Sequence, residues 1–298
     1  MIYDCVIIGG GIAGLQAAIQ LGRYQHNVLV IDDENGRSNL CRSYHNILGW
    51  PDGISGEELR RIGRSQAEKL DIAFHKGTVS EVEKSEKLFE VKVKQGALIK
   101  AKQILIATGI MDHIPLLEQL TPCLGVSVYV CPDCDGYEVK GQRTVVLGAG
   151  NAGAHMAITL NYWTDQITYI NHEQTAVDKE LLEQLDILGI EFYNQSISEV
   201  ACHQGQIGHV ELKDHTCITA DKGFVAFGGN DVKSTIASKL GVELHHNKHI
   251  LVNPRTKLTN VENVWAAGDV VAHSEQVTIA MGDGMQAAIW MHKFLLKE

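Results

Sequence analysis

The sequence predicts an α/β protein made of two Rossmann-like (three-layer ββα) dinucleotide-binding domains, the second inserted in the first. Two stretches combine an apolar strand, a glycine-rich turn and a helical pattern, at residues 4–21 and 144–160. A third apolar strand runs into a glycine turn at residues 264–269. Strands that alternate with helices predict parallel sheets with helices on both faces. We expect the first domain at 1–112 plus 247–298, and the inserted domain at 113–246.

The composition excludes several classes of partner. The chain has 298 residues and a formal net charge of −10, which disfavours nucleic acid and anionic membranes as partners. No apolar stretch reaches the roughly 20 residues of a membrane span. The N-terminus lacks the basic start and the cleavage site of a signal peptide. We therefore expect a cytoplasmic protein.

The first glycine turn has the pattern that binds a dinucleotide. In G-x-G-x-x-G the first glycine permits the tight turn, the second lets the backbone approach a pyrophosphate, and the third lets helix and strand pack closely. The pyrophosphate then lies at the helix N-terminus, which favours anions. Asp32 ends the next strand, eighteen residues after Gly14, and suits ribose hydroxyls. The turn runs through Gly9, Gly11, Ile12, Ala13 and Gly14.

The second glycine turn has the same pattern but a different partner residue. It contains Gly148, Gly150, Asn151 and Gly153, and Asn171 stands eighteen residues after Gly153. Asn171 is neither a carboxylate for an NAD ribose nor an Arg for a 2′-phosphate. The neighbouring histidine at 172 is mostly uncharged near neutral pH. We therefore expect a degraded, weak or unusual nicotinamide site.

Two further stretches add to the first domain. Alternating apolar residues over 79–93 predict an antiparallel ribbon. Asp269 follows Gly268 at a strand-to-turn boundary, where it would hydrogen-bond a ribityl hydroxyl. The helix that follows would direct its N-terminus at the pyrimidine end of an isoalloxazine ring and stabilise negative charge there.

A cysteine pair carries the predicted chemistry. The seven cysteines are odd in number and scattered, which argues against a secreted disulfide framework, and only Cys131 and Cys134 form a motif. Pro132 suits the first position of a helix, whose dipole would lower the thiol pKa. Asp133 would oppose thiolate formation unless it faces solvent. Zinc needs about four ligands, and no second C-x-x-C exists, so we expect a redox pair and no metal.

In combination these motifs resemble the low-molecular-weight thioredoxin reductases, the class II pyridine-nucleotide disulfide oxidoreductases. The resemblance also rests on the stretch Asn46-Ile-Leu-Gly-Trp-Pro-Asp-Gly-Ile-Ser-Gly-Glu-Glu-Leu, on Ala107-Thr-Gly109 and on Ala266-Ala-Gly-Asp269. It implies a homodimer that binds FAD in the domain 1–112 plus 247–298. The inserted domain 113–246 would be NAD(P)-binding-like and would carry the cysteine pair.

The resemblance also implies roles for individual residues. Cys134 would face the flavin, Cys131 would be the interchange thiol, and Asp135 would be the acid/base that moves the thiol proton. FAD contacts would come from the first turn and from further residues along the chain, namely Asp32, Asp33, His45, Asn46, Val79, Ala107, Thr108, Gly109, Gly268, Asp269, Gln276, Val277 and Thr278.

Two departures from the family leave the electron donor and the direction of flow open. The family's basic H-R-R-x-x-x-R stretch is replaced by Asn171-His-Glu-Gln-Thr-Ala-Val, so the donor is NADPH, NADH, ferredoxin or a substrate dithiol. The thiol block is similar to that of flavin-dependent dithiol oxidases, which pass electrons to oxygen but place His at the position of Asp135. We expect an FAD-dependent disulfide/dithiol oxidoreductase that acts on a thioredoxin-like protein or a small-molecule disulfide or dithiol. The alternatives are a dithiol oxidase, a ferredoxin-driven reductase and a non-catalytic flavin redox sensor.

Overall fold

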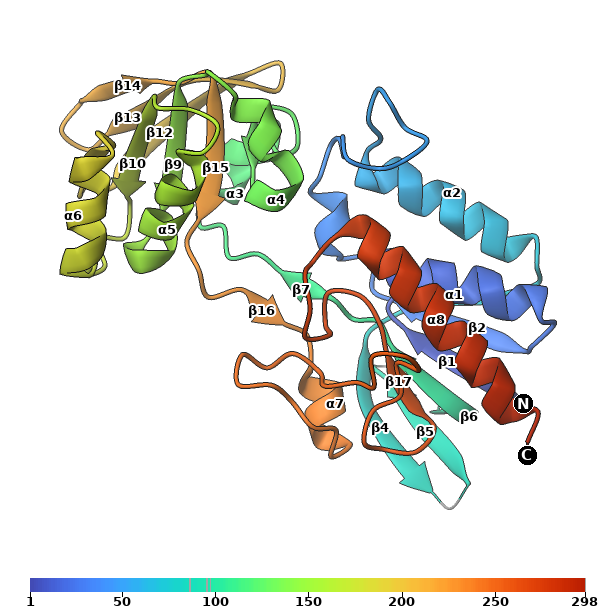
Figure 1. The fold of residues 1–298 in the computed structure, drawn as a ribbon. Helices are drawn as coiled ribbons and strands as arrows, with labels where there is room; N and C mark the ends of the chain where they lie inside the picture. The colour runs from blue at the N-terminus through green and yellow to red at the C-terminus, as the bar shows by residue number, and fades with distance from the viewer. Residues whose placement is uncertain (86, 95, 97, 298) are drawn as a thin grey trace. The chain divides into compact units, whose positions relative to one another are not determined.

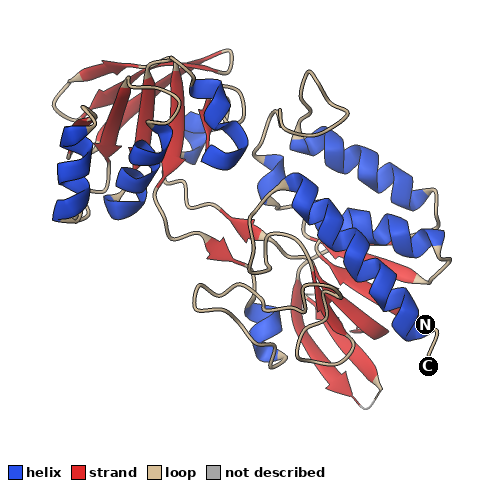
Figure 2. Cartoon of the chain, viewed as in Figure 1, coloured by secondary structure: helices blue, strands red, loops and turns tan. Residues whose placement is uncertain are grey.

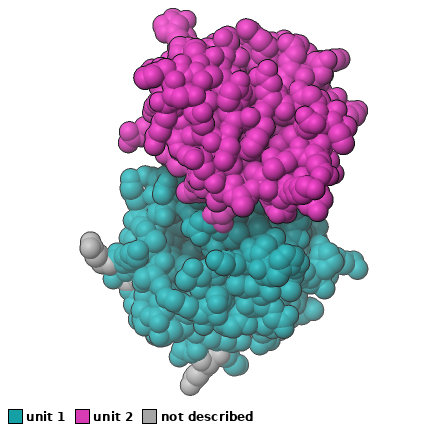
Figure 3. Space-filling view, turned by 90° about the vertical axis from the view of Figure 1, so that its left-hand side faces the viewer, with its two compact units in different colours: residues 1–39, 56–111, 231–298 teal, residues 40–55, 112–230 magenta. Residues whose placement is uncertain are grey.

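The computed structural model describes residues 1–85, 87–94, 96 and 98–297 and divides the chain into two compact units. Unit 1 contains residues 1–39, 56–111 and 231–298, and unit 2 contains residues 40–55 and 112–230 (Figure 3). Unit 2 is thus inserted into unit 1 at two places.

The unit boundaries differ from the expected domain boundaries for two physical reasons. The short strands β7 (Ile110–Met111) and β16 (Asp231–Val232) pair antiparallel. The following helix α7 (Thr235–Lys239) buries Ala237 in the core of unit 1, so residues 231–246 belong to that unit. Residues 40–55 join unit 2, where the N–H of Arg42 donates to the carbonyl of Leu124 at 3.2 Å.

Among the described residues, unit 1 contains a mixed sheet in which β3-β2-β1-β6-β5-β4 are neighbours and β17 also pairs with β6 (Figures 1 and 2). Pairs among β3, β2, β1, β6 and β17 are parallel, whereas β4 and β5 form the expected antiparallel ribbon, apart from residue 86, which lies outside the described residues. The strands are β1 (Ile2–Ile8), β2 (Val28–Asp32), β3 (Ala73–Lys76), β4 (Val79–Ser85), β5 (Leu88–Val93), β6 (Leu98–Ile106) and β17 (Val264–Ala266).

The side chains of β1 alternate between two hydrophobic cores, as the period of a strand requires. Cys5 and Ile7 pack with residues of helices α1 (Ile12–Arg23), α2 (Gly56–Glu68) and α8 (Val277–Leu295). Val6 and Ile8 pack into the other core, with residues of the β4–β5 ribbon and of α7. Cys5 is 0% exposed, which makes it a core residue.

Unit 2 has the three-layer ββα arrangement that the sequence predicts. Among the described residues its central sheet is parallel and has the order β11-β10-β9-β15-β8. One core lies against α5 (Gly150–Leu160) and α6 (Lys179–Ile187), and the other against the antiparallel strands β12, β13 and β14. The strands are β8 (Val128–Tyr129), β9 (Thr144–Gly148), β10 (Ile167–Asn171), β11 (Glu191–Tyr193), β12 (Ile197–His203), β13 (Gln206–Leu212), β14 (Cys217–Thr219) and β15 (Lys222–Ala226). No helix in the described part of the chain combines the length and apolarity needed to cross a bilayer.

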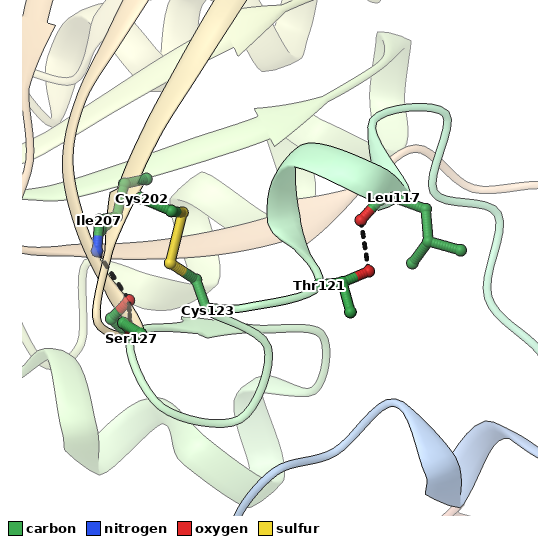
Figure 4. Close-up of a disulfide and its surroundings, with 7 residues drawn as sticks. Leu117, Thr121, Cys123, Ser127, Cys202 and Ile207 are labelled. Carbon is green, nitrogen blue, oxygen red and sulfur yellow. Dashed lines mark hydrogen bonds between the residues drawn. A yellow bond between two sulfur atoms is a disulfide. The ribbon is translucent and has the colours of Figure 1, made fainter.

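A disulfide that the sequence analysis did not identify joins Cys123 to Cys202 within unit 2 (Figure 4). Cys123 follows the short helix α3 (Leu117–Leu120) and is 0% exposed, and Cys202 lies in β12. The two Cα atoms are 6.5 Å apart. Nearby, the N–H of Ile207 donates to Oγ of Ser127 at 2.9 Å, which also ties the β12–β13 hairpin to this part of the chain (Figure 4).

Cys202→Ser is expected to lower the free energy of unfolding of unit 2 by about 2–4 kcal/mol, because a cross-link between distant residues removes loop-closure entropy from the unfolded chain. The bond closes a loop across a sequence separation of 79 residues. Urea unfolding without reductant measures the loss. Cys217→Ser is the matched control, since Cys217 is exposed. Equal stability of the two variants would contradict a structural role for the disulfide.

Candidate active site

The first glycine turn is shaped by backbone groups that leave no room for side chains. Gly9 has φ +107°, and a Cβ at Gly9 would overlap the carbonyl of Ala107. A Cβ at Gly14 would overlap the carbonyl of Gly9. At Gly11, in contrast, no described atom lies within 4 Å of the position of a Cβ. The turn is therefore tight on its inner side and open at its second glycine.

Helix α1 presents its N-terminus to this open space. Its N-cap is Gly11, where no described side chain forms a capping bond, and its first turn carries no acidic residue. The N–H groups of a first helical turn lack partners within the helix and attract anions. The geometry of Gly9–Gly14 therefore fits the pyrophosphate of FAD.

Asp32 and Asp269, which are predicted to contact the ribose and the ribityl chain, each lie beside an arginine. Asp32 ends β2, and Nη2 of Arg60 donates to its Oδ2 at 2.6 Å. Asp269 follows Gly268, whose φ is +81°. Nη1 of Arg37 lies 3.4 Å from Oδ2 of Asp269 and donates to Glu275 at 2.8 Å. Each arginine orients a carboxylate at one of the predicted contacts.

Apart from His45 and Asn46, the remaining predicted FAD contacts of the first domain also belong to unit 1. Val79 begins β4, and Gln276 is the N-cap of α8, which starts with Val277 and Thr278. Residues 107–109 follow β6, with φ +66° at Gly109 and a 2.6 Å hydrogen bond from Oγ1 of Thr108 to the carbonyl of Lys233. Asp33 is exposed and accepts from a nearby backbone N–H at 3.1 Å.

A buried carboxylate on α8 holds the third glycine turn, and the sequence analysis missed it. Asp283 is 5% exposed and accepts from the N–H of Gly268 at 3.3 Å. Nε2 of His273 lies 2.5 Å from its Oδ2, and Nζ of Lys257 lies 2.6 Å from its Oδ1. Burial acts to raise the pKa of Asp283, but the two cationic partners lower it overall. The hydrogen bond to Asp283 in turn raises the pKa of His273.

The cysteine pair lies on a single helical turn of unit 2. Cys131 is the N-cap of α4 (Pro132–Asp135), with Pro132 at the first helical position. The N–H groups of Cys134 and Asp135 both donate to the carbonyl of Cys131, at 3.2 and 3.1 Å. Residues three and four apart share one side of a helix. Because α4 is only one turn long and continues as the 3-10 helix η2 (Gly136–Val139), the predicted dipole effect on the thiols is confined to a short element.

The packing behind the cysteine pair requires a glycine. A Cβ at Gly136 would lie 2.5 Å from the ring of Trp163. Trp163 packs against the α5–α6 core. Asp133 is exposed, so its charge faces solvent.

Asp135 has the electrostatic character of an acid/base near neutral pH. Burial, followed by the charge of Glu138, raises the pKa of Asp135 from 3.8 to about 7. A carboxyl with this pKa can give or accept a proton near neutral pH. Glu138 lies on η2, three residues after Asp135, and the sequence analysis did not identify it.

His45 and Asn46, which the resemblance places near the flavin, belong to unit 2. Nδ1 of His45 lies 3.8 Å from Oε1 of Glu138, and its Nε2 lies 3.0 Å from Oγ of Ser43. Residue 45 is thereby linked to the same glutamate that raises the pKa of Asp135. His45, Glu138 and Asp135 come together only in the folded chain, and no spacing in the sequence predicts that they do.

The second glycine turn also belongs to unit 2, at the start of α5. It includes Gly148, Gly150, Asn151 and Gly153. Asn171 ends β10, is 1% exposed and hydrogen-bonds within the protein. The N–H of Gly150 is therefore already bound by a side chain, whereas the corresponding glycine of the first turn, Gly11, faces open space.

Asp135→Asn is expected to raise the free energy of unfolding above pH 7 and to leave it unchanged near pH 4. The pKa of Asp135 is higher in the folded protein than the ordinary value of 3.8, so ionisation destabilises the fold as the pH rises towards about 7. A shift of this size corresponds to roughly 2–4 kcal/mol. Urea unfolding at both pH values measures it, with the exposed Asp133→Asn as control. A variant that gains nothing above pH 7 would contradict the burial of Asp135.

His273→Gln is expected to weaken the third glycine turn below about pH 6.5 and to matter less at alkaline pH. The pKa of His273 is raised in the fold, so its stabilising charge is fully present below the unfolded value of 6.5 and is lost as the pH rises through the folded pKa. A charged hydrogen bond contributes about 1.5–3 kcal/mol. Thermal melting across this pH range measures the effect, and a pH-independent difference from the native chain would count against it.

Three comparisons place the chain among known proteins. A family model described as pyridine nucleotide-disulphide oxidoreductase matches residues 3–284. The sequence is 28% identical to the thioredoxin reductase of Rickettsia bellii (strain RML369-C) over 98% of each chain. The solved structure of HlmI matches with a TM-score of 0.88 at 26% identity, over 99% of this chain and 93% of that one. The thioredoxin reductase of Streptococcus pyogenes MGAS5005 also matches with a TM-score of 0.88, over 100% of this chain and 99% of that one, and at 24% identity it supports the fold alone.

These findings confirm the predicted fold class and the predicted resemblance. They also confirm the predicted class of enzyme, in which a flavin and a disulfide take part in the reaction. The chain belongs to the pyridine nucleotide-disulphide oxidoreductase family, as a flavoprotein disulfide oxidoreductase that resembles thioredoxin reductase.

Proposed function

We propose that the enzyme passes two electrons between FAD and the pair Cys131 and Cys134, and on to a thioredoxin-like protein or a small-molecule disulfide. The observation that supports this proposal best is the position of Asp135. It follows Cys131 by one helical turn, and its pKa is raised to about 7. A thiol pair with such a carboxyl beside it has the proton carrier that thiol exchange needs.

In this proposal each residue of the turn has one task. The thiolate of Cys131 attacks the substrate disulfide, forms a mixed disulfide and expels one substrate thiolate, which takes a proton from Asp135. Cys134 then attacks the sulfur of Cys131 and releases the second substrate thiol, so that a Cys131–Cys134 disulfide remains. Bound FAD, once reduced by the electron donor, would supply the two electrons that, with two protons, restore both thiols, and would return to its oxidised form.

The reverse direction is the second candidate. A substrate dithiol and dioxygen would give a disulfide and hydrogen peroxide, with the same three residues in the opposite order. Asn171 favours this candidate, because it replaces the carboxylate or arginine expected at a nicotinamide site.

The proposal includes a thioredoxin-like partner and a homodimer, as the family resemblance implies, and a cytoplasmic location, as the composition of the chain indicates. Related proteins named thioredoxin reductase in Rickettsia bellii (strain RML369-C), and bifunctional thioredoxin reductase/thioredoxin in Mycobacterium leprae (strain TN), support this class of partner. Sedimentation of the purified protein tests the dimer.

The test follows the flavin absorbance of anaerobic protein that has been reduced with dithionite and then mixed with oxidised thioredoxin or an aromatic disulfide. Native protein is expected to reoxidise its flavin, and Cys134→Ser is expected to keep the flavin but to react at least about 100-fold more slowly. Cys131→Ser is expected to lose the reaction with the disulfide as well. The matched control is Cys217→Ser, a change at an exposed position. Full activity of Cys134→Ser would refute the role proposed for the pair.

A further inference from the structure

The second glycine turn differs from the first at its middle glycine. Gly150 holds in the second turn the place that Gly11 holds in the first. A Cβ at Gly11 would have no described atom within 4 Å, but a Cβ at Gly150 would lie 3.1 Å from the carbonyl oxygen of Ala176 and 3.3 Å from Oγ1 of Thr175. Gly150 is also buried, so the segment after β10 covers the position at which a pyrophosphate would approach.

Both backbone polar groups of Gly150 are bound by side chains of β10. Its N–H donates to Oδ1 of Asn171 at 2.9 Å, and its carbonyl accepts from the hydroxyl of Tyr169 at 2.8 Å. In a dinucleotide site the second glycine lets the backbone approach the pyrophosphate closely. Here the protein's own side chains already hold that backbone.

Asn171 is fully engaged inside the protein. Its Nδ2 donates to the carbonyl of Thr175 at 2.7 Å and to Oδ1 of Asn194 at 2.8 Å. A primary amide carries two donor hydrogens, and these two bonds use both of them. Because the residue is also 1% exposed, it offers a nicotinamide ribose neither a donor nor access.

The segment of residues 172–178, which covers Gly150, is acidic and is bound to the turn. The side chain of Asn151 donates to Oδ2 of Asp178 at 2.7 Å and accepts from its N–H at 2.9 Å, which ties residues 172–178 to the first turn of α5. This segment carries the carboxylates of Glu173 and Asp178. Burial lowers the pKa of His172, and its Nδ1 accepts from the N–H of Ile197 at 2.9 Å, so the imidazole is neutral.

We propose that the glycine turn at 148–153 does not bind NAD(P)H. Its glycines instead allow helix α5 to pack closely against strand β10. The residues present do not fit the nicotinamide cofactor that the family description implies. Reducing equivalents then reach the enzyme from a donor that does not bind at this turn. This inference does not depend on the thiol chemistry proposed above.

The first test measures nucleotide binding directly. Flavin-loaded protein is titrated calorimetrically with NADPH and with NADH. A parallel anaerobic titration follows the flavin absorbance at about 450 nm, and dithionite is the control that shows the flavin can be reduced. We expect no saturable heat and no bleaching by either nucleotide. Saturable binding of either one, or bleaching by about one equivalent, would overturn the inference. The assay of the proposed function uses dithionite, and not a nucleotide, as its reductant. Binding of NADPH or NADH would therefore overturn this inference without contradicting the proposed function.

The second test examines this packing itself through hydrogen exchange of the Gly150 amide. Asn171→Ala is expected to speed this exchange by about tenfold or more, because the amide loses its acceptor. Gln174→Ala is the matched control on the same segment, since its side chain donates to Oγ of Ser196 and not to the glycine turn. Exchange that is equally slow in both variants would overturn the assignment of Asn171.

Discussion

The close approach of three backbone segments at the first glycine turn is the constraint on which unit 1 depends. A Cβ at Gly14 would overlap the turn itself, and a Cβ at Gly284 of α8 would overlap the carbonyl of Ala13. A Cβ at Gly268 would lie 2.8 Å from the Cβ of Ala13. Because these three residues are glycines and carry no Cβ, α1, α8 and the third glycine turn can meet at one place. A single methyl group at any of them would force these segments apart.

The thiol turn of unit 2 lies in the same unit as other buried titratable groups. Burial raises the pKa of Tyr129 and lowers that of Lys222, and Nζ of Lys222 lies 3.1 Å from the tyrosine hydroxyl. Together with Asp135, these groups are all shifted towards their neutral forms. Burial in this unit therefore disfavours the charged forms of all three groups.

Local patterns predicted much of the fold and of the candidate site. Glycine spacing predicted both turns, because each glycine answers a steric need within a few residues. The two-residue interval between Cys131 and Cys134 predicted their shared turn, because residues three apart lie on one side of a helix. Alternation over 79–93 predicted the ribbon, since one face of a strand repeats every second residue.

Features that depend on distant parts of the chain could not be predicted. The disulfide of Cys123 and Cys202 spans a separation of 79 residues and has no spacing signal. The raised pKa of Asp135 results from burial, which a sequence does not display. Residues 40–55 join unit 2 through contacts with residues far along the chain, such as Leu124.

The glycines of the second turn have a purpose that does not require a ligand. A Cβ at Gly153 would overlap the ring of Tyr169, and a Cβ at Gly148 would lie 2.5 Å from the carbonyl of Ala226. Steric need alone therefore accounts for these two glycines, with or without a nucleotide at the turn. A redesign that aims to make this turn bind a dinucleotide would leave these glycines in place and rebuild the acidic segment of residues 172–178.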